Sequence, residues 1–365
     1  MKLFNDNNHS LYKGNKVSVE IYGASHAEKI GVKIKGLKKG DAFCKEELQS
    51  FLNRRKANNS SYSTTRGEAD KVVYVKGEKN GTFTGKLFIA EIFNSTMRSK
   101  DYGDGVVLPR PAHADYVGHV KYGDKFDYRG GGKFSGRMTA PMCIMGGIFK
   151  QLLKKQGITV NAYVKSIGSV SGKGYLDVDV ENFDFSKIES EFPLLDESVR
   201  QDMIDLIKNV KTDLDSVGGT IECVIKGVKA GEGEFMFDCI ESVISRLAFA
   251  VPAVKGIEFG LGFDFAKSNG SKVNDPFYYD EKGNVKTKTN YNAGINGGIS
   301  NGNPITFRVV IKPTPSIAKE QDTINLKTGK NDKIKIVGRH DACIVPRAVS
   351  VIEAIASLAI YDIIK

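Results

Sequence analysis

The stretch AVSVIEAIASLAIYDII, residues Ala348–Ile364, decides how this chain folds. It is about as long as a membrane span, but it carries Glu353 and Asp362, and its apolar residues fall near helical spacing. We therefore predict a buried helix of the protein core rather than a membrane anchor. Two further stretches, which begin near Pro141 and Phe237, are also apolar on most faces. A helical layer covered on both sides requires helices of this kind.

Strand patterns and a few amphipathic helices surround these three segments. Strands are predicted at Lys16–Tyr22, Gly31–Leu37, Lys71–Lys76, Lys86–Ile92, Ile158–Ile167, Gly219–Val228, Val254–Phe263 and Pro304–Lys312, and helices at Lys45–Arg55, Pro141–Gln156, Val199–Val210 and Phe237–Val251. The stretch Asn94–Gly136 shows little periodicity and is expected to be an irregular, functional loop. Strands and helices alternate without a regular βαβ order, so we predict an α+β fold with sheets packed on a central helical layer. Because no clear linker is visible, residues 1–365 are expected to form a single composite domain.

Composition narrows the class of protein. The chain has 53 Lys plus Arg against 43 Asp plus Glu, a formal charge of +10, which favours polyanions or anionic substrates in general. Its five Cys are scattered without a CxxC pair, so neither a disulfide scaffold nor a zinc site is indicated. Residues 5 to 10 are polar where a signal peptide needs its apolar core. We expect a cytoplasmic protein with reduced thiols.

Three of the five histidines sit in segments rich in hydroxyl and charged groups. These are Ser25-His26 in GASHA, His113 in RPAHAD and His340-Asp341 in GRHDAC. Histidine suits proton transfer near neutral pH, and a nearby Asp can orient it or act as a base. Any one of these histidines alone would be read as a packing or capping group, but three together favour acid-base chemistry.

Glycine stands beside cations in two other segments. Tyr128–Arg137, YRGGGKFSGR, ends just before a predicted helix, so backbone N–H groups, a hydroxyl and cations converge where an anion would be held. Further on, Gly294–Gly302 leads into Lys312–Ser316, KPTPS, which offers an ammonium and two hydroxyls to a phosphate. Neither segment matches a Walker A loop or a Rossmann fingerprint.

Taken in order, these segments resemble one family, chorismate synthase. The resemblance rests on RPAHADY at 110–116, DYRGGG at 127–132, GGISNG at 297–302, IKPTPSI at 311–317 and GRHDACIVPRAV at 338–349, and it extends from about residue 15 to the C-terminus. The chain also departs from the usual pattern. GASHA stands where GESHG is common, and KFSGRMTA stands where RSSARETA is common. We interpret these changes as a divergent branch of the family.

The resemblance implies a reaction and a set of catalytic residues. The family converts 5-enolpyruvylshikimate 3-phosphate to chorismate and phosphate by an FMN-dependent anti-1,4-elimination, the last common step of the shikimate pathway for aromatic amino acids. By this resemblance His26 protonates or stabilises the reduced flavin, and His113 gives a proton to the departing phosphate. Asp341 takes part in removing the C6 proton, and Ser25 and Ser135 support proton relay.

The resemblance also implies which residues bind substrate and cofactors. Cations for the substrate carboxylates and phosphate are Arg55, Arg129, Arg137 and Arg339. For reduced FMN, the corresponding positions are Lys133, Ser135, Ala253, Gly297, Lys312, Pro313, Thr314, Pro315, Ser316 and Arg339. Arg55 also corresponds to an NADP-binding position, but Ser61 replaces a frequent Arg, so we expect external reduction of FMN rather than reduction by bound NADPH. No metal is implied, and family members are commonly homotetramers.

Two alternatives remain open from the sequence. One is a flavin-binding paralogue whose branch-specific changes altered or silenced its activity. The other is a basic nucleic-acid-binding protein, which the excess of cations would suit. Against it, the basic residues are interspersed with acids, and the sequence has no basic tail, RNA-recognition signature or zinc knuckle. We therefore expect no nucleic-acid or membrane partner.

Overall fold

The computed structural model describes residues 9–56, 69–94, 107–188, 191–336 and 341–364. Its contacts divide the chain into two compact units that interleave in sequence. The first unit comprises Met1–Met145, Ile207–Val217 and Pro313–Ile344, and the second comprises Gly146–Leu206, Gly218–Lys312 and Val345–Lys365. Helices α3 (Thr139–Lys154) and α4 (Arg200–Thr212) each begin in one unit and end in the other.

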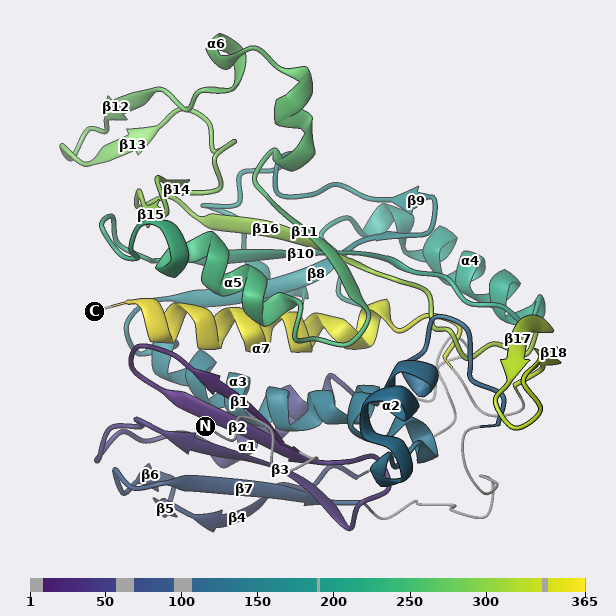
Figure 1. Ribbon diagram of the computed structural model, residues 1–365. Coiled ribbons are helices and arrows are strands. Elements are labelled where there is room, and N and C mark those ends of the chain that lie inside the picture. Colours follow the sequence, from purple (N-terminus) through teal and green to yellow (C-terminus); the bar gives the residue numbers. More distant parts are fainter. Residues whose placement is uncertain (1–8, 57–68, 95–106, 189–190, 337–340, 365) are drawn as a thin grey trace. The chain divides into compact units, whose positions relative to one another are not determined.

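The first unit is built on a five-stranded antiparallel sheet in the order β1-β2-β3-β7-β4 (Figure 1). Its strands are β1 (His9–Lys13), β2 (Ser18–Gly23), β3 (Lys29–Lys35), β7 (Phe88–Phe93) and β4 (Val73–Lys76). Alternate residues of β3, namely Ile30, Val32 and Ile34, are fully buried, as period-two patterning requires. Between β5 (Glu78–Lys79) and β6 (Thr82–Phe83), Asn80 and Gly81 both have positive φ, as the favoured two-residue hairpin turn with Asn-Gly requires.

The first unit contains further elements besides this sheet. They are α1 (Lys45–Asn53), α2 (Asp115–Tyr122) and the hairpin of β17 (Gln321–Asn325) and β18 (Lys330–Ile334). Helix α1 buries Leu48, Phe51 and Leu52, the apolar face predicted from the sequence. Short 3-10 turns follow α2 at Gly123–Lys125 and precede α3 at Gly136–Met138.

The second unit is built on another five-stranded antiparallel sheet, in the order β11-β16-β10-β8-β9 (Figure 1). Its strands are β11 (Val254–Phe259), β16 (Ile305–Ile311), β10 (Gly219–Lys226), β8 (Thr159–Ile167) and β9 (Val170–Ser171). Helix α7 (Val345–Ile363) packs against β8, β10 and α5 (Ile240–Ala248). It is buried along nearly its whole length. This contact on several sides explains why its sequence is apolar all round.

The polar residue in the middle of α7 is held by the chain around it. Glu353 accepts a hydrogen bond from the backbone N–H of Ala162 at 3.1 Å and pairs with Lys150. Gly146 of α3 lies against Ala354, where a methyl group on the glycine would overlap Ala354. The helices of this unit therefore approach each other closely, and a glycine makes that approach possible.

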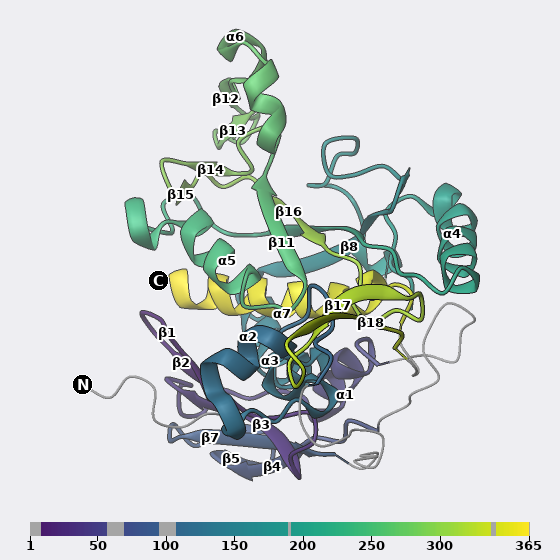
Figure 2. The same cartoon turned by 45° about the vertical axis from the view of Figure 1, so that its right-hand side comes forward.

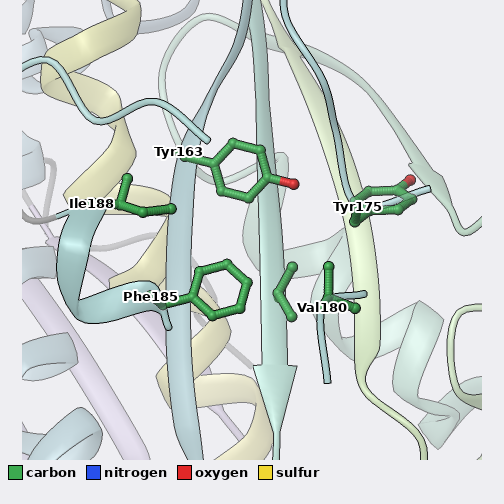
Figure 3. Close-up of a cluster of buried hydrophobic side chains, with 6 residues drawn as sticks. Tyr163, Tyr175, Val180, Phe185 and Ile188 are labelled. Carbon is green, nitrogen blue, oxygen red and sulfur yellow. The ribbon is translucent and has the colours of Figure 1, made fainter. Parts of the chain in front are cut away.

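A buried aromatic cluster covers part of the same unit. Tyr163, Tyr175, Val180, Phe185 and Ile188 pack together (Figure 3). Smaller elements project from the unit, as Figure 2 shows for α6 and the hairpin of β12 and β13. The small elements of the unit, projecting or not, are α6 (Gly270–Val273), β12 (Phe277–Tyr279), β13 (Val285–Thr287), β14 (Ile295–Asn296), β15 (Ile299–Ser300), and 3-10 turns at Phe185–Ile188, Glu197–Val199, Met236–Asp238 and Gly262–Lys267.

The α+β class and most predicted elements are confirmed, with corrections at several boundaries. The stretch predicted as irregular contains helix α2. Helix α5 begins at Ile240 rather than Phe237, and strand β11 ends at Phe259 because Gly260 turns the chain with φ 54°. Hairpins β12–β13 and β17–β18 were not predicted. No described helix is long and apolar enough to cross a membrane. The single composite domain stays a prediction.

Candidate functional site

A glycine turn between Arg129 and Phe134 forms the centre of the candidate site. Gly130, Gly131 and Gly132 all have positive φ, a conformation that other residues adopt only with strain. The carbonyl of Gly132 accepts a hydrogen bond from the backbone N–H of Ser25 at 3.1 Å. The turn is therefore fastened to the loop that carries Ser25 and His26.

Two histidines meet this turn. A methyl group on Gly130 would lie 2.5 Å from Cε1 of His26 and 2.7 Å from Oγ of Ser25. A methyl group on Gly131 would lie 3.3 Å from Nε2 of His113 and 3.6 Å from Cβ of Ser135. The structure thus brings together four of the five residues that the sequence predicts to be catalytic, which come from three separate stretches of chain.

His113 is held from its other side. Its Nδ1 lies 2.7 Å from Oδ1 of Asp115, and Arg110 donates to both oxygens of that carboxylate at 2.6 and 2.8 Å. Burial by itself would raise the pKa of Asp115, but hydrogen bonds from Arg110 and His113 hold it well below its usual range. Asp115 is therefore ionised at neutral pH.

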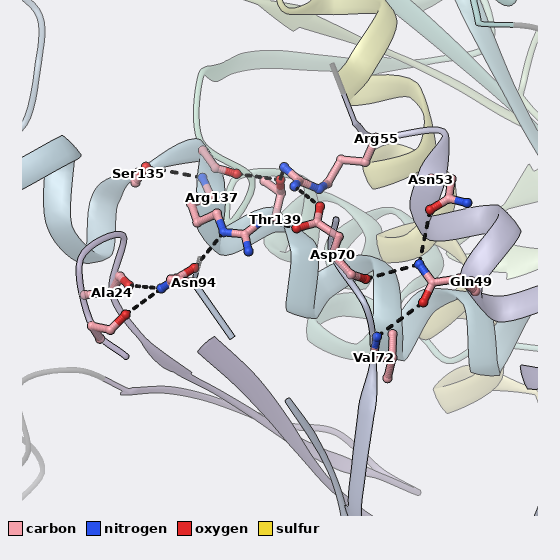
Figure 4. Close-up of polar contacts among 12 residues, drawn as sticks. Ala24, Gln49, Asn53, Arg55, Asp70, Val72, Asn94, Ser135, Arg137 and Thr139 are labelled. Atoms are coloured by element: carbon pink, nitrogen blue, oxygen red, sulfur yellow. Dashed lines mark hydrogen bonds and ion pairs between the residues drawn. The ribbon is translucent and has the colours of Figure 1, made fainter. Parts of the chain in front are cut away.

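A buried ion cluster lies in the same unit (Figure 4). Asp70 pairs with Arg55 at 2.7 Å and also with Arg137, and the two arginines are only 6% and 8% exposed. Burial disfavours the charged carboxylate, but the positive charges of Arg55 and Arg137 lower the pKa of Asp70. Among the described residues, two guanidinium groups thus share this one carboxylate.

Asn94 connects this cluster to the histidine loop. Its Oδ1 accepts a hydrogen bond from Nε of Arg137 at 2.9 Å. Its Nδ2 donates to the carbonyls of Ala24 and Ala27, at 3.3 and 2.7 Å, on either side of His26 (Figure 4). The position of Arg137 is thereby tied to the position of His26.

Arg129 and Lys133, the cations flanking the glycines, are more exposed. Asp127 accepts hydrogen bonds from Nε and Nη2 of Arg129 at 2.8 and 2.9 Å. The ammonium of Lys133 lies 3.3 Å from the centre of the Tyr122 ring, a cation–π contact. Each cation is thus oriented by a neighbour in its own stretch of chain.

The segment from Pro313 to Ser316 also belongs to the first unit. The hydroxyl of Thr314 donates to the carbonyl of Asp341 at 2.8 Å, and that of Ser316 accepts from Nη1 of Arg110 at 3.1 Å. The backbone of Asp341 is thereby joined to the KPTPS segment. Arg339 lies outside the described residues.

The remaining predicted cofactor residues, Ala253, Gly297 and Lys312, belong to the second unit. The backbone N–H of Lys312 donates to the carbonyl of Ala253 at 2.9 Å. Gly297 forms the turn between β14 and β15 with φ 62°. Burial, assisted by the charge of Lys255, lowers the pKa of the Lys312 ammonium. An anion beside Lys312 would favour its charged form.

Comparison with known proteins shows the family to which the chain belongs. The model of the family described as chorismate synthase matches residues 17–364. The chain belongs to the chorismate synthase family. A chorismate synthase of Lachnoclostridium phytofermentans is 44% identical over 351 residues, which cover 96% of this chain and 94% of that protein. One from Korarchaeum cryptofilum is 38% identical over 349 residues, which cover 96% of each chain.

The same family appears among solved structures. A crystal structure of a chorismate synthase superposes with a TM-score of 0.75 at 25% identity, covering 96% of this chain and 92% of that one. The chain is accordingly an enzyme of the chorismate synthase family, a lyase of the shikimate pathway. The resemblance seen in the sequence is confirmed.

Branch-specific residues of this chorismate synthase occupy definite places. Phe134, which stands where a hydroxyl is common, is 37% exposed and packs near Tyr122 and Phe126, with ring centres 6.4 and 6.0 Å away. Met138, which stands where Glu is common, is buried. Phe134 thus joins an aromatic cluster beside the glycine turn, near which His26 and His113 also lie.

Four residues of the site were not predicted to be functional. Asp70, Asn94, Arg110 and Asp115 make the contacts that orient the predicted arginines and histidines. Arg110 and Asp115 lie in the RPAHADY motif, and Asn94 begins the stretch predicted to be irregular. What the sequence could not supply was the partner of each side chain. No cluster of His, Cys, Asp and Glu that could hold a metal ion is found within the described ranges.

Proposed function

We propose that this enzyme converts 5-enolpyruvylshikimate 3-phosphate to chorismate and phosphate with reduced FMN as cofactor. The observation that carries the proposal is the contact of His26 and His113 with one glycine turn, Gly130–Gly132. In the reaction a proton leaves C6 of the substrate, the C3–O bond breaks, and the phosphate departs. Such an elimination needs a base, an acid and a cationic pocket, and the site offers candidates for each.

His113 is the proposed acid. Phosphate leaves more readily when a proton reaches its oxygen as the C–O bond breaks. Nδ1 of His113 is occupied by Asp115, so Nε2, the nitrogen nearest Gly131, is the one that can serve the substrate. A side chain at position 131 would meet this nitrogen, since a Cβ there would lie 3.3 Å from it.

His26, Ser25, Ser135 and Asp341 complete the proposed catalytic set. His26 is buried against Gly130, where a positive imidazolium would stabilise an anion. Asp341 is the proposed participant in removing the C6 proton. Ser25 and Ser135 carry hydroxyl groups on the two sides of the glycine turn and would relay protons within it.

We propose that the residues implied by the family resemblance hold the phosphate and the ring of FMN. When bound, reduced FMN supplies transient electron density to the allylic system of the substrate. The residues that the family resemblance proposes for it are Lys133, Ser135, Ala253, Gly297 and Lys312–Ser316. The lowered pKa of Lys312, caused by burial and then by Lys255, is what an anion such as phosphate would relieve. Arg339 stays a prediction of the sequence.

The buried ion cluster fits an anionic substrate. Arg55 and Arg137 are proposed to face its carboxylates and phosphate, together with Arg129. Lys56 adds to the local field: its pKa is lowered by burial and further by the charges of the two arginines, although Asp70 acts in the opposite direction. Positive potential therefore accumulates in this part of the first unit, which an anion would neutralise.

Anaerobic assay tests the proposal. Protein is mixed with dithionite-reduced FMN and 5-enolpyruvylshikimate 3-phosphate, and chorismate absorbance is followed with phosphate release. Equal amounts of the two products, dependent on reduced FMN, are expected. Flavin binding without chorismate would favour the silenced paralogue. Salt-sensitive RNA binding without flavin binding would favour the nucleic-acid alternative.

The source of reduced flavin is a separate part of the proposal. We propose external reduction, because Ser61 replaces a frequent Arg, although Arg55 corresponds to an NADP-binding position. Ser61 lies outside the described residues. With oxidised FMN and NADPH alone, no chorismate is expected; steady turnover under these conditions would assign a flavin reductase activity to the chain. We further propose a cytoplasmic homotetramer.

A further inference from the structure

Both carboxylate oxygens of Asp115 make hydrogen bonds to side chains that precede helix α2. Oδ2 accepts from the backbone N–H and Nε of Arg110 at 3.1 and 2.6 Å. Oδ1 accepts from Nη2 of Arg110 at 2.8 Å and lies 2.7 Å from Nδ1 of His113. The side chain is only 6% exposed. Asp115 thus turns back from the first position of α2 toward the residues that precede the helix.

The direction of the hydrogen bond to His113 follows from the charge of Asp115. An ionised carboxylate has no hydrogen to give, so the bond requires a hydrogen on Nδ1 of His113. In the neutral imidazole, Nε2 then carries the lone pair, and in the cation it carries the exchangeable proton. Nε2 is also the atom of His113 that a Cβ on Gly131 would approach most closely, at 3.3 Å.

We infer that Asp115 is a positioning residue that fixes the tautomer and ring orientation of His113, and that Arg110 clamps Asp115 for this purpose. The inference rests on the proposed function, in which His113 protonates the departing phosphate. Asp115 need not touch the substrate. It acts by keeping Nε2 of His113 available to give a proton and to take one back.

Arg110 extends the arrangement to the KPTPS segment. Its Nη1 donates to Oγ of Ser316 at 3.1 Å, 206 residues away in sequence. The same guanidinium therefore holds the carboxylate behind His113 and contacts a segment proposed to bind FMN. Lysine at position 110 would keep the charge but could not make the two-pronged contact with Asp115.

The Asp115→Asn variant keeps the size of the side chain but removes its charge and replaces one acceptor oxygen by a donor. Arg110 presents hydrogen-bond donors to both positions of the group, so an amide can satisfy only one of them with its oxygen. If that oxygen stays with Arg110, the amide NH₂ faces His113 and favours the tautomer with hydrogen on Nε2. In a Ser-His-Asp triad the equivalent change lowers kcat by about 10⁴ while the geometry is kept.

The first measurement is kinetic and uses the FMN-loaded enzyme. We expect kcat of Asp115→Asn to fall by about 10²-fold or more, with the FMN dissociation constant within threefold of wild type. The kcat of Arg110→Lys is expected to fall about tenfold. Asp264→Asn, which removes a carboxylate from an exposed ion pair with Lys267, is the matched control and should retain wild-type kcat. A kcat within threefold of wild type in folded Asp115→Asn would overturn the inference.

The second measurement does not depend on turnover. Solid-state NMR of protein carrying ¹⁵N-labelled histidine, with His113→Asn used to assign the signal, reports which imidazole nitrogen bears hydrogen. Wild type should show protonated Nδ1 in neutral His113, both with and without FMN, and Asp115→Asn should shift hydrogen toward Nε2. A wild-type signal with bare Nδ1 would refute the assignment, even if Asp115→Asn fails to fold. If wild type makes no chorismate, the proposed function fails while this measurement still decides the role of Asp115.

Discussion

At the scale of single residues, the site depends on side chains that act through each other. His113 is held by Asp115, and Arg137 is held by Asp70 and Asn94. Such pairs lie inside the protein, where water competes weakly for hydrogen bonds and charges. The loss of one partner therefore leaves the other buried and unsatisfied, which costs more than the contact itself contributes.

Replacement of His113 tests the proposed acid. His113→Ala should lower kcat by about 10²–10⁴-fold, the usual range for loss of a general acid, and leave FMN binding nearly unchanged. Stopped-flow turnover and a flavin titration measure the two effects. His119→Ala is the matched control because His119 is exposed on α2, and it should retain wild-type turnover. Full activity of His113→Ala would remove His113 from the mechanism.

Asp70 gives a prediction about pH. Its pKa is lower in the folded protein than in the unfolded chain, so its ionised form stabilises the fold above the unfolded pKa of about 3.9. This stability is lost as the pH falls through the folded value. Asp70→Asn should reduce the free energy of unfolding by about 3–5 kcal/mol at pH 7, because two buried arginines lose their anion.

The difference in the free energy of unfolding between wild type and Asp70→Asn should narrow as the pH falls from about 5 toward 3, because the wild-type carboxyl then takes up its proton. Urea unfolding of both proteins at a series of pH values measures this difference. Asp264→Asn, at an exposed ion pair, should follow wild type throughout. A stability difference that grows toward low pH would contradict the assignment of Asp70 as a native-state anion.

At the scale of elements, helix packing explains the apolar character of the central segments. Helix α7 lies against β8, β10 and α5. Little of its surface is therefore exposed to water, where polar residues would be favourable. Its Glu353 is tolerated because Lys150 and a backbone N–H satisfy the carboxylate. The close approach of α3 at Gly146 leaves no room for a side chain.

Gly146→Ala tests this approach. The added methyl group meets the backbone of Ala354, so the helices must separate, and the free energy of unfolding should fall by about 1–3 kcal/mol despite the better helix propensity of alanine. Gly270→Ala in α6 is the matched control, because its methyl group meets only Asn274 atoms at ordinary distances. Equal stability of Gly146→Ala and wild type would show that α3 and α7 can move apart freely.

At the scale of the whole molecule, the chain exposes several large apolar side chains. Phe237, Phe263 and Tyr279 of the second unit are 90%, 80% and 77% exposed. Exposed aromatic residues are often buried between subunits in oligomers. This exposure agrees with the homotetramer that the family resemblance implies, which stays a prediction.

Sedimentation equilibrium tests the oligomeric state. We expect a mass four times the 39.9 kDa of one chain at micromolar protein concentration, with and without FMN. Phe237→Ser together with Phe263→Ser should weaken the assembly, whereas Lys267→Ser, at an exposed ion pair, should leave it intact. A monomer over the whole concentration range would reject the tetramer.

Much of this protein was determined by local sequence. The apolar period of α7, the Asn80-Gly81 turn and the alternation in β3 each depend on residues close together in the chain. The order of the motifs likewise identified the family, because motifs can be recognised in the sequence without knowledge of the three-dimensional structure. Helix α2 was missed because its short, partly exposed sequence carries a weak period.

Only the tertiary structure decided which side chains form ion pairs and hydrogen bonds with each other. Asp70 is shared by Arg55 and Arg137, which lie 15 and 67 positions away in sequence, and Arg110 joins Asp115 to Ser316 across 206 positions. No local pattern specifies such pairs, because their geometry depends on how sheets and helices pack. The sequence by itself determined the chemistry available to this enzyme; packing decided how each acid, base and cation is oriented.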